Sequence, residues 1–258
     1  MIDLHCHVLP GIDDGPDTIE DSLALARAAS AAGTHTMVAT PHVNRHYPNG
    51  PETIARLVAE VNSRLLAEEI AIDVRPGAEI ALLSAVEMNA EQLGRLTLGG
   101  GPWLLVEPPF TPAATGLDAM MLDVARHGFQ VVIAHPERCP AFHRERAVLE
   151  SLVRAGMLTS ITAGSLVGRF GSHARRFALG LIRDGLVHNV ASDAHDPFHR
   201  APGMAAELHS SGMDSLADWF TSQVPAAVLA GGVVPPRPGV AVEAQRSRRL
   251  WPWQRSSS

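Results

Sequence analysis

The chain opens on Met1-Ile-Asp-Leu-His5-Cys-His7, a short apolar run that ends in a His-x-His pair. The run Ile2–Leu4 is typical of a β-strand, and side chains alternate between the two faces of a strand. His5 and His7 at the end of this strand therefore point to the same side, where two imidazoles can bind one metal ion. Cys6 lies between them and points the other way.

Short apolar runs alternate with helical stretches along the rest of the chain, as in repeated βα units around a parallel sheet. One helix is expected from a capping box at Thr18 to Gly33, and another over 51–69. Three more are expected to end at Gly128, Gly156 and Gly185. The predicted strands are Ile2–Leu4, Thr36–Thr40, Ile70–Arg75 continuing to Glu79, Trp103–Glu107, Gln130–Ala134, Leu158–Thr162 and Val187–Ala191. Seven βα units in 258 residues predict an α/β barrel in a single domain.

Histidines and carboxylates collect where the predicted strands end. The residues in these positions are His5, His7, His42, Glu79, Glu107, His135, Asp193 and His195. Active sites of α/β barrels lie at the C-terminal ends of the strands. Residues without a shared role would scatter over both ends of the barrel, so the pattern predicts a site for more than one metal ion.

Composition excludes several functions. A formal net charge of −6 argues against a nucleic-acid partner. No apolar run reaches the roughly 18–20 residues of a membrane span, and no signal peptide is apparent before the first strand. Only two cysteines, Cys6 and Cys139, are present, which fits a reducing compartment. These features predict a cytoplasmic protein.

The 21 basic residues are all arginine. Without lysine there is no Schiff-base chemistry and no carbamylated lysine to bridge two metals, so any bridging ligand must be a carboxylate. The remaining histidines considered are interpreted as surface or helix residues outside the site: His35, His46, His127, His143, His173, His188 and His209.

At this point several motifs resemble those of a known family. They are Asp3-Leu-His-Cys-His7, Asp13-Asp-Gly-Pro16, Thr40-Pro-His42, Pro76-Gly-Ala-Glu79, Leu105-Val-Glu-Pro-Pro-Phe110, Ala134-His-Pro-Glu-Arg138, Ile161-Thr-Ala-Gly-Ser-Leu-Val-Gly-Arg-Phe-Gly171 and Ala191-Ser-Asp-Ala-His195. Together they are similar to the PHP (polymerase and histidinol phosphatase) superfamily, and within it to the manganese-dependent protein-tyrosine phosphatases of bacterial capsule and exopolysaccharide operons. The resemblance implies a PHP-type distorted (β/α)7 barrel over residues 1–231, followed by a tail over 232–258.

The resemblance also implies three divalent metal ions. The first would be held by His5, His7, Glu79 and Asp193; the second by Glu79 as a bridge with Glu107 and His135; the third by Asp14, His42 and His195. Asp13 remains an alternative to Asp14. An imidazole and carboxylate ligand set suits manganese, with iron or zinc as alternatives. Arg138 and Arg200 match arginines that would bind the phosphate.

The implied reaction is hydrolysis of phosphotyrosine in a protein, the tail of a membrane-associated tyrosine kinase that controls polysaccharide export. The metals would activate a water molecule for in-line attack on phosphorus. Asp196 is either a general acid or a loop-capping residue. A cysteine-based phosphatase is excluded, because neither Cys6 nor Cys139 has an arginine six positions on.

Three alternative functions remain open. The first is a phosphatase for a small substrate such as histidinol phosphate, and the second is a PHP exonuclease, which the acidic chain disfavours. The third is a metal-stabilised regulator that binds a kinase without turnover, although such a protein would be expected to lack ligands or phosphate-binding arginines.

The C-terminal tail combines arginine with tryptophan. Residues 245–258 contain Arg246, Arg248, Arg249, Arg255, Trp251 and Trp253 and no acid. This composition is typical of segments that contact an anionic membrane surface. The alternative is a terminus without a role, because Pro252 opposes an amphipathic helix.

Overall fold

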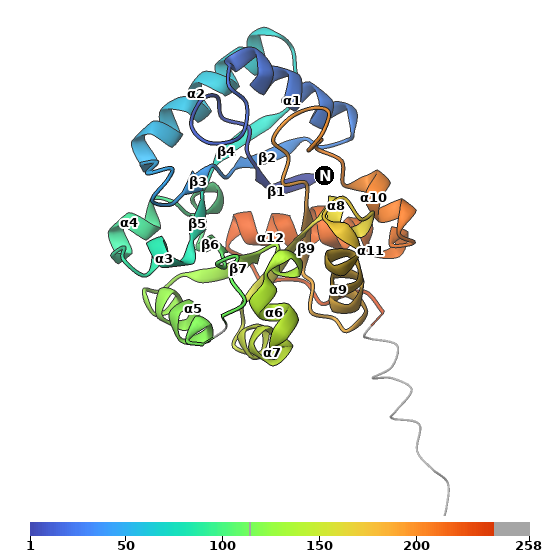
Figure 1. The fold of residues 1–258 in the computed structure, drawn as a ribbon. Coiled ribbons are helices and arrows are strands. Elements are labelled where there is room, and N and C mark those ends of the chain that lie inside the picture. Colours follow the sequence, from blue (N-terminus) through green and yellow to red (C-terminus); the bar gives the residue numbers. More distant parts are fainter. Residues whose placement is uncertain (114, 240–258) are drawn as a thin grey trace, which may run out of the picture.

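The computed structural model describes residues 1–113 and 115–239 (Figure 1). All sheet pairing between its named strands is parallel, in one sheet of order β1-β2-β4 and another of order β3-β5-β6-β7-β8-β9. The strands are β1 (Ile2–Cys6), β2 (Thr36–Ala39), β3 (His42–Val43), β4 (Asp73–Pro76), β5 (Glu79–Ala81), β6 (Trp103–Glu107), β7 (Gln130–Ala134), β8 (Leu158–Thr162) and β9 (Asn189–Ala191). The predicted α/β class is therefore confirmed.

Two short segments of the chain pass directly from the first sheet to the second. The chain passes from β2 to β3 over Thr40 and Pro41, and from β4 to β5 over Gly77 and Ala78. Proline lacks the N–H that a continuous strand would donate. A Cβ atom on Gly77 would lie 2.7 Å from Val38 Cγ1 and 3.3 Å from the Ala39 carbonyl oxygen, so a larger residue there would require its neighbours to shift. The prediction of one continuous strand from residue 70 to 79 was therefore wrong, since this region forms two short strands beginning at Asp73.

The first and last strands also meet. Cys6 and Ala194 form an isolated parallel bridge. The Asp193 N–H donates to the His5 carbonyl at 2.8 Å, and the His7 N–H donates to the Ala194 carbonyl at 2.8 Å. These bonds place the chain after β9 beside the end of β1. Complete closure of a seven-stranded barrel stays a prediction, because the strands divide into two sheets.

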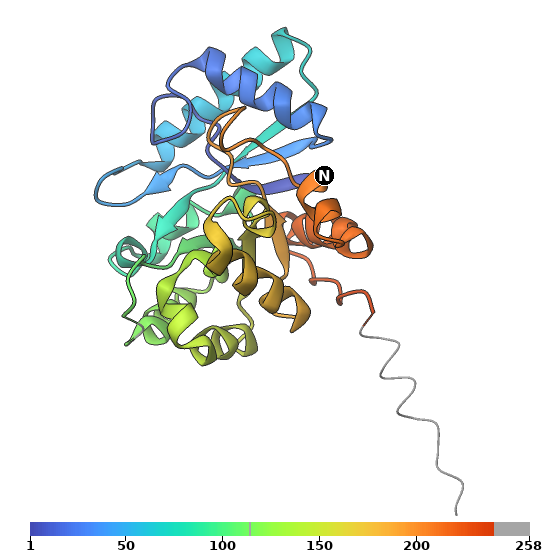
Figure 2. The same ribbon diagram turned by 45° about the vertical axis from the view of Figure 1, so that its right-hand side comes forward.

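Helices cover the outside of the strands, with α1 and α2 over the sheet of β1, β2 and β4 (Figures 1 and 2). The α-helices are α1 (Ile19–Ala31), α2 (Pro51–Ala67), α3 (Leu82–Ala85), α4 (Ala90–Gly94), α5 (Leu117–Arg126), α6 (Pro140–Arg144), α7 (Arg146–Arg154), α8 (Ala163–Leu166), α9 (Gly171–Arg183), α10 (Ala205–Ser210), α11 (Asp214–Asp218) and α12 (Val224–Ala230). Short 3₁₀ turns span Leu98–Gly100 and Pro136–Arg138, and a π-helical turn spans Trp219–Gln223.

The predicted helix ends are confirmed at several places. The Asp21 N–H donates to Thr18 Oγ1 at 3.2 Å, and the Thr18 N–H donates to Asp21 Oδ2 at 3.2 Å, which is a complete capping box. Helices α5, α7 and α9 each end two residues before a glycine with positive φ, namely Gly128, Gly156 and Gly185. Glycine adopts this conformation without the steric cost of a Cβ atom.

Most strands are buried on both faces, as expected of parallel sheets covered by helices, whereas Asp73, Arg75 and Pro76 of β4 are exposed. Every residue of β2, β8 and β9 is buried, and so are Leu104, Leu105 and Val106 of β6. Burying one such side chain contributes roughly 1.5–3 kcal/mol. Polar side chains at the strand ends are therefore exceptions that need an explanation.

The described chain ends at residue 239. Before that point, the Trp219 indole N–H donates to the Pro235 carbonyl at 3.0 Å. The arginine and tryptophan residues of the predicted membrane-contact segment, 245–258, lie outside the described residues. Across residues 1–113 and 115–239, no helix combines the length and apolar character that crossing a bilayer requires.

His188 was predicted to be a surface or helix residue, but it lies just before β9, outside any helix, and is partly buried. Its Nδ1 accepts from the Thr159 N–H at 3.2 Å. Burial, with a smaller contribution from the charge of Arg237, lowers the pKa of His188 to about 4. Below the ordinary histidine pKa of about 6.5, the unfolded chain takes up a proton that the folded protein does not.

We therefore expect protonation of His188 to lower the free energy of unfolding as the pH falls from about 6.5 to about 4. The total decrease is up to about 3 kcal/mol. Asparagine can accept the Thr159 bond without titrating, so His188→Asn is expected to have a flatter pH dependence than the wild-type protein. The free energy of unfolding of both proteins, measured with denaturant at several pH values, checks this expectation. Any contribution of bound metal to that free energy is common to the two proteins and cancels in the comparison. The same pH dependence of the unfolding free energy in both proteins would contradict the expectation.

Candidate metal centre

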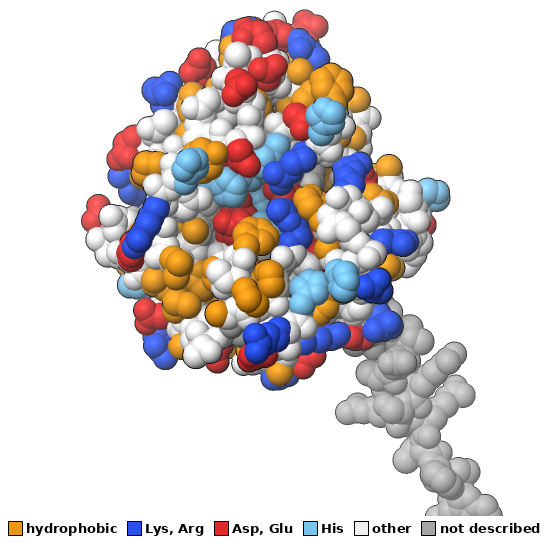
Figure 3. Space-filling model, in the orientation of Figure 1, with side chains coloured by type: hydrophobic (Ala, Val, Ile, Leu, Met, Phe, Trp, Pro, Cys, Tyr) orange, Lys and Arg blue, Asp and Glu red, His pale blue; other side chains and the backbone are white. Residues whose placement is uncertain are grey.

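The nine predicted metal ligands come together in a hollow where strands end and their continuations begin (Figure 3). His5 lies in β1, and His7 follows that strand. Glu79 begins β5, and Glu107 ends β6. The others lie in loops or strand ends nearby: Asp14, His42, His135, Asp193 and His195. Histidine and acidic side chains occupy the middle of the hollow, and arginines flank it (Figure 3).

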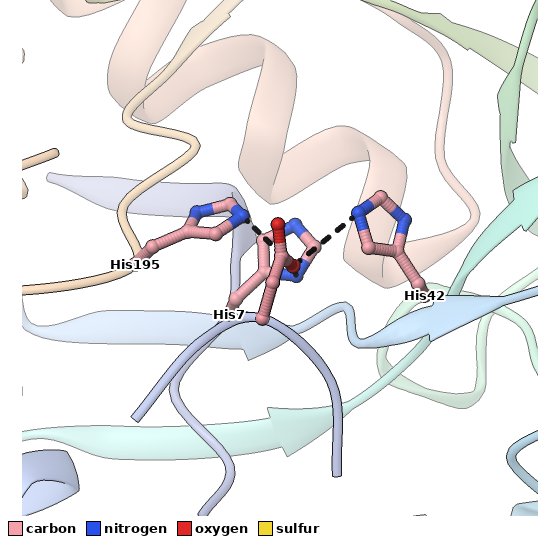
Figure 4. Close-up of side chains that lie close together, drawn as sticks. His7, His42 and His195 are labelled. Atoms are coloured by element: carbon pink, nitrogen blue, oxygen red, sulfur yellow. Dashed lines mark ion pairs between the residues drawn. The ribbon is translucent and has the colours of Figure 1, made fainter. Parts of the chain in front are cut away.

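Asp14 is surrounded by three imidazoles. Its Oδ1 lies 3.3 Å from His195 Nε2, 3.5 Å from His42 Nε2 and 3.8 Å from His7 Nδ1. Figure 4 shows the three rings around this carboxylate, with the pairs to His42 and His195 dashed. The predicted third site is thus brought together, with the ring of His7 beside it.

Glu79 is the centre of the remaining cluster. Its Oε2 lies 3.0 Å from His42 Nδ1 and 3.4 Å from both His5 Nε2 and His7 Nε2, while its Oε1 lies 2.8 Å from His135 Nε2. Glu107 Oε1 is 3.5 Å from His135 Nε2. A carboxylate with a different imidazole at each oxygen is well placed to bridge two cations.

Asp193 completes the cluster from the loop after β9. Its Oδ1 lies 3.4 Å from His5 Nε2 and 3.5 Å from His7 Nε2. The ligands form four overlapping groups, and within each group the ligand atoms lie within 4.8 Å of one another. The groups are His7, Asp14, His42 and His195; His5, His7 and Asp193; His5, Glu79 and His135; and His42, Glu79 and Glu107.

Several of these ligand atoms are buried and lie near one another, but they do not have the geometry of a hydrogen bond to any described residue. They are His5 Nε2, His7 Nε2, His42 Nδ1, Glu79 Oε2 and His195 Nε2. Leaving a buried polar atom unsatisfied costs about 1–3 kcal/mol. Divalent cations would supply the missing partner for all of them at once, and nitrogen and carboxylate oxygen are suitable donors. The residues present therefore fit bound metal ions.

The surroundings lower the pKa of some carboxyl groups in the cluster and raise that of another. Burial alone would raise the pKa of Glu79, but His5, His135 and His42 hold it well below its usual range. Asp193 behaves in the same way, because the histidines and Arg200 outweigh its burial. Burial and the nearby charge of Glu79 raise the pKa of Glu107 to about 7. Anionic Glu79 and Asp193 are the form that binds a cation.

The structure distinguishes Asp13 from Asp14. The Asp13 carboxylate is already occupied, because it lies 2.7 Å from His7 Nδ1 and accepts from the Gly15 and His42 N–H groups at 3.0 Å. The Asp14 side chain is 44% exposed, and its Oδ1 faces the imidazoles of His7, His42 and His195. This geometry favours Asp14 as the ligand and makes Asp13 the group that orients the His7 ring.

Two site residues have unusual backbones. His135 has φ +27° and Asp193 has φ +51°, in the region that favours glycine. Such conformations cost on the order of 1–3 kcal/mol and persist where the surrounding structure imposes them. In both residues the turn directs the side chain into the cluster as the strand ends.

The two predicted phosphate-binding arginines flank Asp193. Arg138 Nη1 donates to Asp193 Oδ2 at 2.6 Å, and Arg200 Nη2 donates to the same oxygen at 2.7 Å. Both side chains are partly exposed at the hollow, at 20% and 31%. They can therefore reach a ligand from solvent while remaining next to the cluster.

Asp196 caps its own loop. Its carboxylate accepts from the N–H groups of Phe198 at 2.7 Å, His199 at 2.5 Å and Arg200 at 3.0 Å. These bonds hold the loop that carries Arg200. Of the two interpretations of Asp196, this arrangement favours loop capping over a general acid.

Sequence reasoning missed two aromatic contacts. The ring of Phe110 stacks on His135 with centroids 5.5 Å apart, and Tyr47 stacks on His42 with centroids 5.8 Å apart. Both aromatic residues lie in loops, where periodicity carries no information. Each limits the rotation of a predicted ligand.

Comparison with known proteins identifies relatives over most of the chain. The family model described as capsular polysaccharide synthesis, CpsB/CapC, matches residues 1–212. Tyrosine-protein phosphatase YwqE of Bacillus subtilis is 39% identical over 197 residues, which are 76% of this chain and 78% of that protein. Putative tyrosine-protein phosphatase CapC of Staphylococcus aureus is 30% identical, covering 81% of this chain and 82% of that protein.

The fold has a close counterpart among solved structures. A chain from the crystal structures of YwqE from Bacillus subtilis and CpsB from Streptococcus pneumoniae, described as metal-dependent tyrosine phosphatases, superposes with a TM-score of 0.83. It is 34% identical and covers 92% of this chain and 98% of its own. Dihydropyrimidinase from Brevibacillus agri, at 14% identity and a TM-score of 0.54, covers 91% of this chain and 72% of its own and shares only the fold.

Proposed function

The chain belongs to the CpsB/CapC family of capsular polysaccharide synthesis, and from this membership we propose that it is a metal-dependent protein-tyrosine phosphatase. The observation that carries the proposal is the buried cluster of histidines and carboxylates, in which five ligand atoms have no hydrogen-bond partner among the described residues. A cluster of this kind is costly to fold without a cation and is suited to hydrolysis of a phosphate ester.

We propose that three divalent ions bind, with manganese as the native metal and iron or zinc as alternatives. The proposed ligand sets are His5, His7, Glu79 and Asp193; Glu79, Glu107 and His135; and Asp14, His42 and His195. Four carboxylates would balance four of the six positive charges of three divalent ions. The remaining positive charge, together with Arg138 and Arg200, suits a hydroxide and an anionic phosphate ester.

When bound, the ions would supply an acidified water molecule and charge neutralisation at the phosphate oxygens. Arg138 and Arg200 would bind the phosphate, because a guanidinium fork matches its oxygens and both arginines approach the cluster from the exposed side. On substrate binding their donors would move from Asp193 to the phosphate. A phenolate with a pKa of about 10 leaves without a strong general acid, which agrees with the capping role of Asp196.

The proposed physiological substrate is a phosphotyrosine protein, the tail of a membrane-associated tyrosine kinase that controls capsule or exopolysaccharide synthesis. The hollow lies on an open face of the molecule, where a peptide chain can approach it (Figure 3). Cys6 and Cys139 form no disulfide, which fits the proposed cytoplasmic location.

A direct comparison of substrates tests this proposal. With Mn²⁺ present, we expect kcat/KM for a phosphotyrosine peptide to exceed that for histidinol phosphate at least tenfold, because an alkoxide is the poorer leaving group and an open site encloses a small ligand poorly. Phosphate release from both substrates provides the measurement. A higher kcat/KM for histidinol phosphate would assign the chain to small-molecule phosphatases, and binding of a kinase without turnover would assign it to regulators.

A further inference from the structure

A cavity of about 610 Å³ opens beside Arg138 and includes none of the nine proposed metal ligands. It lies between the hollow and helices α6 and α9, where histidine and arginine side chains gather on the surface (Figure 3). The short turn that carries Glu137 and Arg138 forms its inner wall. The proposed reaction gives this space no role.

Two phenylalanine rings connect the cavity to the phosphate-binding region. The Arg138 guanidinium carbon lies 4.4 Å from the ring centre of Phe170 and 5.4 Å from that of Phe110. Phe110 also stacks on His135. A phosphotyrosine whose phosphate contacts Arg138 would therefore place its neighbouring residues at the mouth of this cavity.

The cavity carries positive charge that the fold does not neutralise. Its charge comes from Arg144, which is exposed along the lining beside the exposed imidazoles of His143 and His173. Within residues 1–113 and 115–239, no carboxylate lies within the 4.0 Å ion-pair distance of the Arg144 guanidinium. An uncompensated arginine beside a cavity attracts an anionic group.

The carboxyl group in the lining does not offset this charge. Glu137 is fully buried, and its Oε1 accepts from the Thr162 N–H at 3.0 Å and from the Ser165 hydroxyl at 2.7 Å. It is therefore engaged with the chain beneath the cavity.

We propose that this cavity binds an acidic side chain located close in sequence to the phosphotyrosine of the protein substrate, with Arg144 as its main contact and His173 beside it. The inference rests on the proposed function and specifies its substrate class. Charge complementarity selects a carboxylate, and the phenylalanine rings accommodate the peptide that carries it.

The test uses phosphotyrosine peptides that differ only by glutamate or glutamine at single positions within three residues of the phosphotyrosine. At one or more positions we expect the wild-type protein with Mn²⁺ to favour the glutamate peptide about three- to fivefold in kcat/KM, the range of a partly exposed ion pair. Arg144→Gln is expected to reduce this ratio to near one and leave turnover of p-nitrophenyl phosphate unchanged. High salt should also reduce the wild-type ratio.

Arg56→Gln is the matched control, because Arg56 is an exposed arginine of α2 that pairs with Glu60 of the same helix. It should retain the preference for glutamate. His173→Gln provides a second variant of the cavity and should reduce the preference partly. Equal kcat/KM for the glutamate and glutamine peptides, or an unchanged preference in Arg144→Gln, would overturn the inference while peptide turnover still supported phosphatase activity. Failure to hydrolyse any phosphotyrosine peptide would instead contradict the proposed function, and this inference with it.

Discussion

Replacement of Glu79 by glutamine is expected to remove bound metal and to lower kcat by about three orders of magnitude or more. Glu79 is 1% exposed and contacts His5, His7, His42 and His135. The substitution preserves volume but removes the negative charge that the proposed bridge between two ions requires. Elemental analysis of the purified variant and turnover of a phosphotyrosine peptide measure the two effects.

Glu87→Gln makes the same chemical change at an exposed site, where Glu87 pairs with Arg45. It is expected to leave both metal content and turnover unchanged. Circular dichroism separates loss of metal from loss of fold in the Glu79 variant. Normal turnover by a folded Glu79→Gln protein would refute the bridging role.

Arg138→Ala and Arg200→Ala are each expected to lower kcat/KM about a hundredfold while metal content stays normal. Each arginine donates to Asp193 Oδ2. Removing one leaves Asp193 less compensated, so its attraction for a cation should not weaken. The loss of activity would then reflect the missing donor to the phosphate.

Arg45→Ala serves as the control for these variants, because Arg45 is exposed and pairs with Glu87. Metal content and peptide turnover, measured on the same samples, distinguish binding of the phosphate from support of the metal centre. Metal loss in proportion to activity would show that the arginines support the metal centre rather than the substrate.

Much of the architecture could be predicted because it depends on local patterns. Alternating apolar runs predicted the parallel strands, and the capping box at Thr18 and the glycines after α5, α7 and α9 predicted helix ends. The interruptions at Pro41 and Gly77 were not predicted. The close approach of Gly77 to Val38 arises between strands, and a single strand pattern does not reveal it.

The candidate site could largely be predicted because its residues lie at the ends of parallel strands or directly after them. The choice between Asp13 and Asp14 was not, since it depends on which carboxylate the backbone of Gly15 and His42 engages. The positive φ angles of His135 and Asp193 and the shared contact of two arginines with Asp193 also arise only in the folded chain. Sequence position identified the chemical groups, and tertiary contacts determined how each is used.

The central claim is that this buried cluster hydrolyses phosphotyrosine through bound metal. Its most direct test is turnover of a phosphotyrosine peptide by chelator-stripped protein, with metal content followed by elemental analysis during titration with Mn²⁺. We expect no turnover without metal and recovery to a maximum near three ions per chain. Full turnover by protein shown to contain no metal would contradict the account.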